Sequence, residues 1–565
     1  MDNSFFIQVH NRDYSHYEFF SNNETHQTNS TKLDIDPIEH SLFHGDIFTV
    51  DDQNSVCIQK SDVRSKKHIP GVLILQNNRT YGRTSNKKRL LYKCIPYDTN
   101  LPIFLVPYDI SLEFSKCVSN KYVLFTFHEW SSMHPQGVLC ESLGNVNDLN
   151  ALAEYELYGN HLQYSLKDMN KQLKMKLKPQ DEMIEDISRS LKFKLQHAPE
   201  QYVFSIDPHG SKDYDDAFAI DTIDGNTFVT IHIANVAIWL EYLQLWNHLT
   251  QRVSTIYLPD CKKTMLPAIL SDQVCSLQQK QRNITMFTRF PILPNGDIDF
   301  EKITFGNGVV KVRKNYDYEE PNLLANQRYQ HLHKVTQTLD SSVLDSHDVV
   351  SFWMIQVNMY LAKKLQEYDI GIFRNATLKY NERMNLGFDK HICDTLFHYK
   401  NACSNYVKSD HHDLQHVIMN KDIYTHITSP IRRNVDLLNQ SILLYRCSHI
   451  IDVSVSSQRF LIHWMNNLDK MNEDTKKIKY VQNKLQLLHT CLEQKHLSEE
   501  IMSSIVVDKD EKDGMNHYNV FVPELKVFLS AISDKDFKEY DTCDIRVFVF
   551  EDENHVRNKI KIQII

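Results

Sequence analysis

Four aspartates stand within ten residues of one another, between two apolar runs, and no other segment of the 565-residue chain constrains its fold as strongly. The apolar runs are residues 202–204 and 217–220, and a surface loop seldom lies between two such runs. Pro208 and Gly210 predict a turn in the connection, so we expect the first aspartate to fold back toward the other three. The four residues are Asp207, Asp213, Asp215 and Asp216.

This spacing predicts a site for divalent cations. Carboxylates that converge within a few ångströms repel one another strongly unless a cation neutralises them. Mg²⁺ is the natural choice, because it prefers oxygen ligands and is often completed by substrate phosphates, and Mn²⁺ is an acceptable substitute. Two such ions can bind the attacking and the leaving oxygen of a phosphoryl displacement. The alternatives are an acidic surface turn and a calcium loop without its terminal glutamate, and the flanking apolar runs argue against both.

A second informative motif lies far downstream, at residues 424–436. Pro430 is tolerated in the first turn of a helix, which predicts that Arg432 and Arg433 lie early in a helix. The positive end of a helix and two guanidinium groups together form a clamp for phosphate. Taken alone, the motif is also compatible with an ordinary capped helix that carries solvated arginines. Taken with the aspartates, it indicates chemistry on a phosphodiester.

Both motifs resemble those of the ribonuclease II (RNB) family, whose signatures are an Ile-Asp-Pro turn followed by Asp-x-Asp-Asp-Ala and, later, Ser-Pro-Ile-Arg-Arg. The resemblance implies that the four aspartates hold Mg²⁺ and that Asp215 and Arg432 take part in catalysis. It also implies a set of RNA-binding residues, which comprises Tyr257, Tyr318, Arg432 and Arg433. The expected activity is 3′→5′ exonucleolytic hydrolysis of single-stranded RNA to nucleoside 5′-monophosphates.

The charge of the chain is unevenly distributed. Its net charge is −9, yet residues 60–93 carry ten basic residues and a single acidic one, Asp62. Phosphate backbones respond to such a local positive field rather than to the net charge. We expect this segment, which includes Lys87, Lys88 and Arg89, to bind single-stranded RNA. The alternative is a solvated basic loop without a partner.

The order of strand, turn and helix signals predicts a multidomain α/β and all-β chain. Short β-like runs broken by turn residues are typical of small barrels, and a long central block mixes strand and helix signals. We expect an N-terminal tail at residues 1–36, cold-shock-like OB-folds at 37–112 and 113–178, a central α+β RNB catalytic domain at 179–498, and a C-terminal RNA-binding OB-fold at 499–565.

What the sequence lacks excludes several classes of protein. Its eleven cysteines form no Cys-x-x-Cys pair, which argues against a disulfide framework or a zinc site and for a reducing compartment. No stretch reaches the ~18 apolar residues that a membrane-spanning helix needs. We expect a cytoplasmic or nuclear monomer without a membrane partner. Association with the exosome is not expected, because the chain has no room for the N-terminal endonuclease domain of the exosome-associated family members.

The chain departs from the family pattern at Asn235, Phe352, Asn434 and Gln440, which replace Asp, Glu, Tyr and His respectively. These departures remove no expected metal ligand, but they bear on substrate preference and rate. They leave open a rival interpretation, a catalytically weakened RNB-like protein that binds RNA without cutting it. Another rival, a Mg²⁺-dependent phosphotransferase or glycosyltransferase that uses the Asp-x-Asp pair, leaves the arginine motif unexplained.

Overall fold

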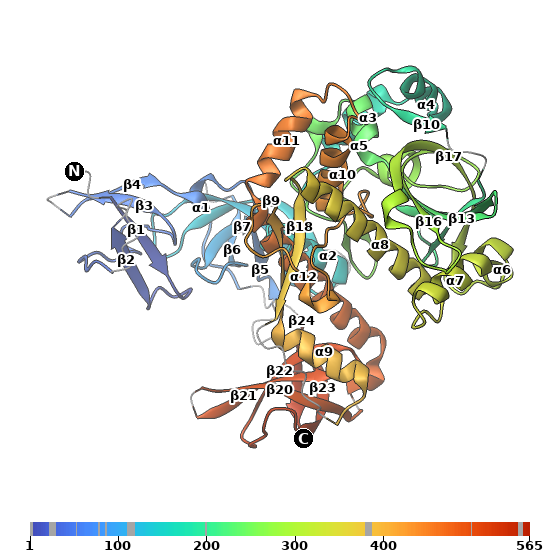
Figure 1. The fold of residues 1–565 in the computed structure, drawn as a ribbon. Coiled ribbons are helices and arrows are strands. Elements are labelled where there is room, and N and C mark those ends of the chain that lie inside the picture. The colour runs from blue at the N-terminus through green and yellow to red at the C-terminus, as the bar shows by residue number, and fades with distance from the viewer. Residues whose placement is uncertain are drawn as a thin grey trace. The chain divides into compact units, whose positions relative to one another are not determined.

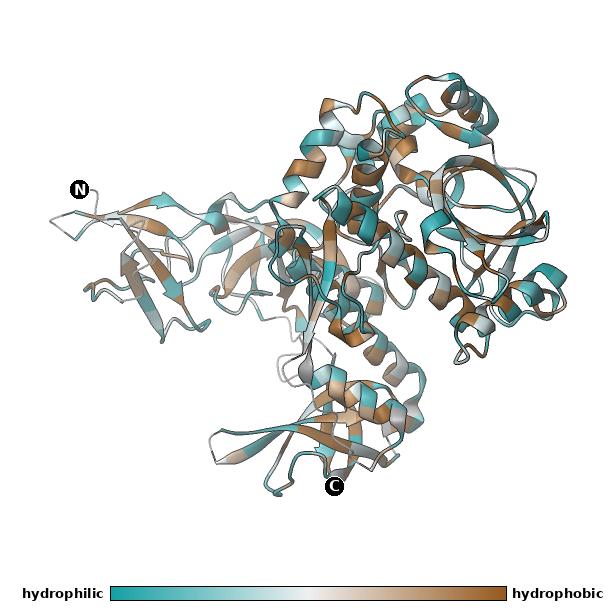
Figure 2. Ribbon diagram, viewed as in Figure 1, coloured by the Kyte–Doolittle hydropathy of each residue, from teal (hydrophilic) through white to brown (hydrophobic). Residues whose placement is uncertain are grey.

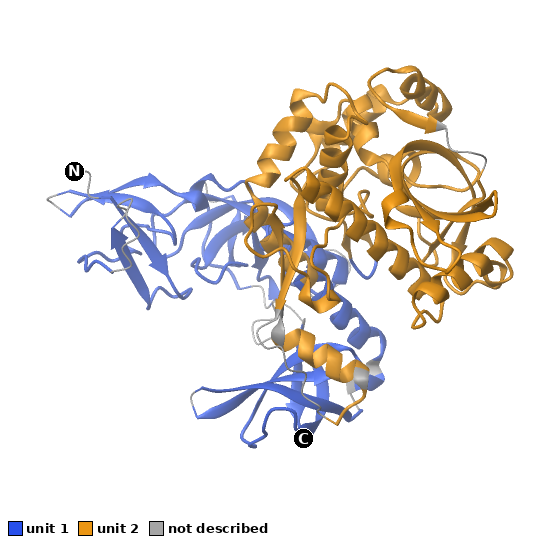
Figure 3. Ribbon diagram, in the orientation of Figure 1, with its two compact units in different colours: residues 1–163, 258–260, 480–565 blue, residues 164–257, 261–479 orange. Residues whose placement is uncertain are grey.

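The structure is a computed structural model of the chain, and it divides into two compact units (Figure 3). Unit 1 comprises residues 1–163, 258–260 and 480–565, and unit 2 comprises residues 164–257 and 261–479. The residues that the structure describes are 4–21, 30–51, 54–76, 79–84, 88–109, 119–197, 201–378, 387–498, 500–512, 514–551 and 558–565.

Unit 2 is built around a six-stranded sheet with the order β10-β17-β11-β12-β13-β16. The long strand β17 also pairs with β16, so five of these strands close into the ring visible in Figure 1. The strands are β10 (Leu195–His197), β11 (Val203–Asp207), β12 (Asp216–Ile223), β13 (Asn226–Ala234), β16 (Arg282–Ile292) and β17 (Thr304–Asp317). Strands β12 and β13 are joined at Asp224 and Gly225, which have φ values of 50° and 78°, as a tight hairpin turn requires.

Helices and two short sheets complete unit 2. Its helices are α3 (Lys167–Lys176), α4 (Gln180–Arg189), α5 (Val236–Tyr242), α6 (Pro321–Leu324), α7 (Gln327–Leu339), α8 (Ser346–Glu367), α9 (Lys390–Asn401), α10 (Asn434–Arg446) and α11 (Val455–Met465). The short sheets pair β14 (Ile256–Tyr257) with β15 (Lys262–Lys263), and β18 (Ile372–Leu378) with β19 (Ala402–Lys408). Helix α12 (Leu468–Glu493) begins in unit 2 and ends in unit 1.

The core of unit 2 lies where the central strands meet α5, α8 and α10. Phe204, Phe218 and Ile231 from the strands are completely buried, as are Trp239 of α5 and Trp353 of α8. Figure 2 colours these elements by hydropathy, and consecutive residues of β12 and of α5 are buried, as expected of elements that are covered on more than one face. This packing holds the loops at the ends of β11 and β12 on a rigid base.

Unit 1 contains three β modules. A four-stranded sheet has the order β2-β1-β3-β4, a closed barrel has the order β5-β6-β7-β9-β8, and a five-stranded sheet has the order β22-β21-β20-β23-β24. The first two modules comprise β1 (Ser4–Val9), β2 (Tyr17–Ser21), β3 (Ile47–Val50), β4 (Val56–Lys60), β5 (Ile69–Leu73), β6 (Leu90–Pro96), β7 (Phe104–Tyr108), β8 (Lys121–Glu129) and β9 (Gln136–Asn145). The third comprises β20 (Met502–Lys512), β21 (Met515–Val522), β22 (Val527–Ser533), β23 (Thr542–Glu551) and β24 (Asn558–Ile564), and the unit's helices are α1 (Asp62–Ser65) and α2 (Leu149–Gly159).

The N-terminal part of unit 1 differs from the sequence-based expectation in two places. The described part of residues 1–36 is not a tail, because β1 and β2 pair with each other and bury Ile7 and Phe19 against Phe48. The expected boundary between residues 112 and 113 falls inside the closed barrel, because β5 pairs with both β6 and β8. Strand pairings of this kind join segments distant in sequence, so local turn signals misplace the boundaries. Within the described residues, no helix is long and apolar enough to cross a bilayer.

Candidate active site

The aspartate segment connects two neighbouring strands of unit 2. Asp207 is the last residue of β11 and Asp216 is the first residue of β12, and the two strands are antiparallel partners through Phe204 and Phe218. The connection turns at Gly210, whose φ is 78°. Both ends of the segment therefore reach the same end of the sheet, as the turn residues predicted.

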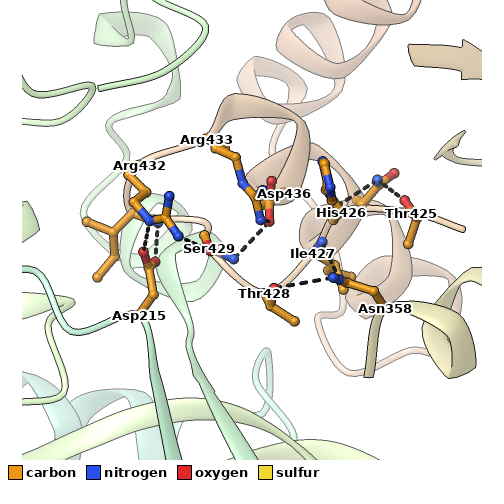
Figure 4. Close-up of polar contacts among 12 residues, drawn as sticks. Asp215, Asn358, Thr425, His426, Ile427, Thr428, Ser429, Arg432, Arg433 and Asp436 are labelled. Atoms are coloured by element: carbon orange, nitrogen blue, oxygen red, sulfur yellow. Dashed lines mark hydrogen bonds and ion pairs between the residues drawn. The ribbon is translucent and has the colours of Figure 1, made fainter. Parts of the chain in front are cut away.

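Asp215 links this segment to the arginine motif (Figure 4). Its Oδ1 accepts a hydrogen bond from the Ile431 N–H at 2.9 Å, and its Oδ2 accepts one from Arg432 Nε at 3.1 Å. Asp215 is only 3% exposed, and burial raises the pKa of its carboxyl to about 7. Tertiary packing thus brings the two sequence motifs into direct contact.

The two arginines face different carboxylates (Figure 4). Arg432 points to Asp215 and also donates to Ser429 Oγ at 3.0 Å, whereas Arg433 donates to Asp436 Oδ1 at 2.8 Å. The expectation that both lie early in a helix is wrong, because α10 begins at Asn434. Arg433 is its extended N-cap residue, and its backbone bridges to Ser254. Arg432 therefore lies in the turn before the helix, with its guanidinium free to contact the aspartates.

Asp207 and Asp216 carry the least compensated charge in the site. The Oδ2 atoms of both are buried, and neither has a hydrogen-bond partner among the residues that the structure describes. Burial, reinforced by neighbouring carboxylates, raises the pKa of Asp207 to about 7 and that of Asp216 to about 8. A buried polar atom without a partner is unusual in a folded protein and is often explained by an ion. These oxygens therefore fit the divalent cation that the aspartate spacing predicts.

The carboxylates do not form a ready-made metal cluster. Among the described residues, no three His, Cys, Asp or Glu side chains are grouped closely enough to hold a metal ion as they stand. Two of the aspartates instead face cations of the chain itself: Asp215 faces Arg432, and Asp213 Oδ1 lies 2.7 Å from Lys262 Nζ. Lys262 was not among the site residues expected from the sequence, and it lies opposite Tyr257 in the β14–β15 hairpin.

Two tyrosines lie beside the carboxylates. Tyr257 is 45% exposed, and burial of its hydroxyl near Asp213 raises its pKa. The Tyr318 ring stacks on the His347 ring with a centroid distance of 3.6 Å, and the Tyr318 N–H donates to the Asp207 carbonyl at 3.1 Å. Both expected RNA-binding tyrosines are therefore in the same unit as the aspartates and within their electrostatic reach.

The basic segment belongs to unit 1. Lys88 and Arg89 precede β6, and Arg89 Nε pairs with Asp109 Oδ2 at 3.0 Å, with more than half of each side chain exposed. Lys87 lies outside the described residues. RNA binding by these three residues stays a prediction.

Two of the departures from the family pattern, Asn235 and Gln440, form neutral contacts inside unit 2. Asn235 caps α5 by accepting from the Ile238 N–H at 3.2 Å. Gln440 accepts from the Ala237 N–H at 3.2 Å and donates to the Ala234 carbonyl at 2.9 Å. It therefore joins α10 to the connection between β13 and α5. These amides therefore hold the scaffold beneath β12 and β13 together.

Comparisons with known proteins agree with this geometry. Residues 196–341 and 324–446 match the RNB domain. DIS3-like exonuclease 2 of Xenopus tropicalis is 27% identical over 304 residues, which are 52% of this chain and 35% of the relative. Ribonuclease R of Chlamydia pneumoniae is 23% identical over 319 residues, which are 42% of this chain and 46% of the relative. The chain thus spans less than half of the length of these curated relatives.

Solved structures share the fold. RNase R of Mycoplasma genitalium, in complex with ribose methylated single-stranded RNA, matches 99% of this chain and 100% of its own with a TM-score of 0.66 and 16% identity. Yeast Ssd1, a pseudonuclease, matches 94% of this chain and 78% of its own with a TM-score of 0.57 and 13% identity. The fold is that of a central RNB domain accompanied by β-barrel modules. Residues 196–446 of the chain thus carry an RNB domain, so the resemblance and the fold class expected from the sequence are confirmed.

Proposed function

We propose that this protein is a 3′→5′ exoribonuclease that hydrolyses single-stranded RNA to nucleoside 5′-monophosphates with Mg²⁺, for which Mn²⁺ can substitute. The observation that carries the proposal is the contact between Asp215 and Arg432, which lies beside the unpartnered oxygens of Asp207 and Asp216. Carboxylates bind divalent cations and a guanidinium binds phosphate, so the site contains both groups that phosphodiester hydrolysis requires.

Each residue has a distinct role in this reaction. The aspartates would hold the divalent ions, which would lower the pKa of a bound water and neutralise charge on the reacting phosphate. Arg432 donates to the phosphate oxygen on which negative charge develops, and Asp215 and Ser429 orient its guanidinium. Although burial lowers it, the pKa of Arg432 lies above its usual value because of the Asp215 carboxylate, so the guanidinium stays charged.

The tyrosines suit single-stranded substrates. The half-exposed Tyr257 ring offers a face on which a base can stack, and stacking is tolerant of sequence. Tyr318, supported by His347, offers a second aromatic surface. Contacts to the 2′-hydroxyl would distinguish RNA from DNA. We further propose that the protein acts as a monomer, independently of the exosome, in the cytoplasm or nucleus.

The test uses the purified chain and a 5′-labelled single-stranded RNA with a free 3′ end. A ladder of products shortened from the 3′ end, formed with Mg²⁺ and abolished by EDTA, is expected. Release of nucleoside 5′-monophosphates, checked by chromatography, identifies the bond that is cut. Endonucleolytic fragments or cleavage that persists in EDTA would contradict the proposal.

A second candidate function is RNA binding without cleavage. The observation that favours it is the structural likeness to the pseudonuclease Ssd1. All four aspartates and Arg432 are nevertheless present, and the departures Asn235 and Gln440 act in the scaffold. Tight binding of the labelled RNA with no cleavage in either Mg²⁺ or Mn²⁺ would favour this candidate.

A further inference from the structure

Lys262 is an ion-pair partner inside the aspartate site. Its Nζ lies 2.7 Å from Asp213 Oδ1 and 3.4 Å from Asp272 Oδ1. The Lys262 side chain is 28% exposed and the Asp213 side chain is 11% exposed, so water screens the pair only weakly. Asp272 Oδ1 also accepts from Ser271 Oγ at 2.6 Å. The ammonium is therefore held between two anchored carboxylates.

The four aspartates thus divide into two that face a cation of the chain and two that do not. Asp215 already faces the Arg432 guanidinium, and Asp213 already faces the Lys262 ammonium. Within the part of the chain that the structure describes, Asp207 and Asp216 have no such partner, and each keeps a buried Oδ2 atom without a hydrogen bond. Two of the four carboxylates thus lie within 3.1 Å of a cation of the chain, and among the described residues the other two do not.

Two further carboxylates nearby are also in ion pairs, and one of them, Asp272, shares the Lys262 ammonium with Asp213. Asp436 is fully buried, but it is paired with Arg433 at 2.8 Å. A second divalent ion would therefore have to bind Asp213 in direct opposition to the Lys262 ammonium.

We propose that Lys262 takes the place of one of the two divalent ions that a four-aspartate site would otherwise hold, so that this protein binds a single Mg²⁺ or Mn²⁺, at Asp207 and Asp216. Lys262 acts through Asp213 and is a positioning residue. An ammonium 2.7 Å from a carboxylate both satisfies its charge and repels an incoming cation. This inference rests on the proposed function only for the identity of the metal, because the contacts of Lys262 are independent of the reaction.

The test counts the Mn²⁺ ions bound by the full chain without RNA, by electron paramagnetic resonance and equilibrium dialysis. The parent protein is expected to bind a single Mn²⁺ tightly. The Lys262→Met variant, which keeps the length of the side chain but removes its charge, is expected to bind a second one. Lys262→Arg, which restores the positive charge, is expected to return to one. The neighbouring Lys263→Met in β15 is the matched control and should behave as the parent.

Two results would overturn the proposal: two Mn²⁺ ions in the parent, or no additional ion in a Lys262→Met variant whose circular dichroism is unchanged. The count in the parent decides the matter even if Lys262→Met fails to fold. Because the ions are counted without RNA, a protein that binds one Mn²⁺ but cuts no RNA would contradict the proposed function and leave this inference standing. In an active enzyme, the rate should rise hyperbolically with Mg²⁺ concentration in the parent and sigmoidally in Lys262→Met.

Discussion

Asp215 Oδ2 accepts a hydrogen bond from Arg432 Nε at 3.1 Å, although 217 residues separate the two in sequence. The neighbouring Ile431 N–H donates to the other oxygen of the same carboxylate at 2.9 Å. The carboxylate thus fixes both the backbone and the side chain of the arginine motif. Substitutions of Asp215 or Arg432 should therefore lower the rate of RNA cleavage more than they lower RNA affinity.

Asp215→Asn is expected to abolish RNA hydrolysis while RNA affinity stays within a few-fold of the parent. The reason is that an amide cannot supply the negative charge that holds the Arg432 guanidinium in place, whereas binding along the strand depends on other residues. Single-turnover cleavage and filter binding measure the two quantities. Asp224→Asn, in the exposed β12–β13 turn, is the control and should retain full activity. Retained cleavage in Asp215→Asn would contradict the assignment of Asp215.

Arg432→Ala is expected to lower the turnover rate by about 10²–10³, the usual effect of removing a donor aimed at developing charge. RNA affinity should fall much less, because Arg432 contacts a single phosphate. Arg446, at the exposed end of α10, provides the matched control, and Arg446→Ala should change neither quantity. Equal losses of rate and affinity in Arg432→Ala would make Arg432 a binding residue only.

Arg433→Ala is expected to lower the stability of the fold. The change removes the cation that pairs with the fully buried Asp436 carboxylate, which keeps the Ser429 N–H as a donor. Loss of the charged partner should lower the free energy of unfolding by about 1–3 kcal/mol. Urea unfolding of the variant and of the parent measures the difference. An unchanged midpoint together with a large loss of RNA affinity would instead assign Arg433 to RNA, as the family resemblance implies.

Replacing Lys87, Lys88 and Arg89 by alanine should flatten the dependence of log affinity on log salt by about two units, at about 0.7 per phosphate contact. The single-turnover rate at saturating RNA should stay the same, because the aspartates are unchanged. Asp109→Ala makes the opposite change: it releases Arg89 from its ion pair and should tighten binding at low salt. An unchanged slope in the triple variant would show that the strand binds elsewhere.

The choice of substrate provides a test that needs no variant. A single-stranded RNA with a free 3′-hydroxyl should be shortened, whereas a 3′-phosphate or a blunt duplex should block the reaction. The reason is that the site proposed here requires an unpaired 3′ end with bases free to stack on Tyr257 and Tyr318. Decay of 5′- and 3′-labelled substrates of equal length measures the polarity. Equal decay of the blunt duplex and the single strand would contradict the predicted preference for a single-stranded 3′ end.

Much of the candidate site could be predicted from the sequence, because its signals are local. Pro208 and Gly210 mark a turn that lies between two apolar runs, so the aspartates they join reach one end of a sheet. The Ser-Pro-Ile-Arg-Arg motif is equally local, and it indicates phosphate chemistry once it is taken together with the aspartates. Neither signal depends on which distant segment packs beside it.

Only the tertiary structure decided which charged side chains form ion pairs with one another. Lys262 reaches Asp213 across 49 residues, and Arg433 turns to Asp436 although it adjoins Arg432. The strand pairings that place β1 and β2 in a sheet, and that close one barrel across the expected boundary, are equally non-local. Backbone propensities and turns act over a few residues and can be read from the chain. The partner of a buried charge is chosen by packing between distant segments, because burial there makes an unpaired charge too costly to leave.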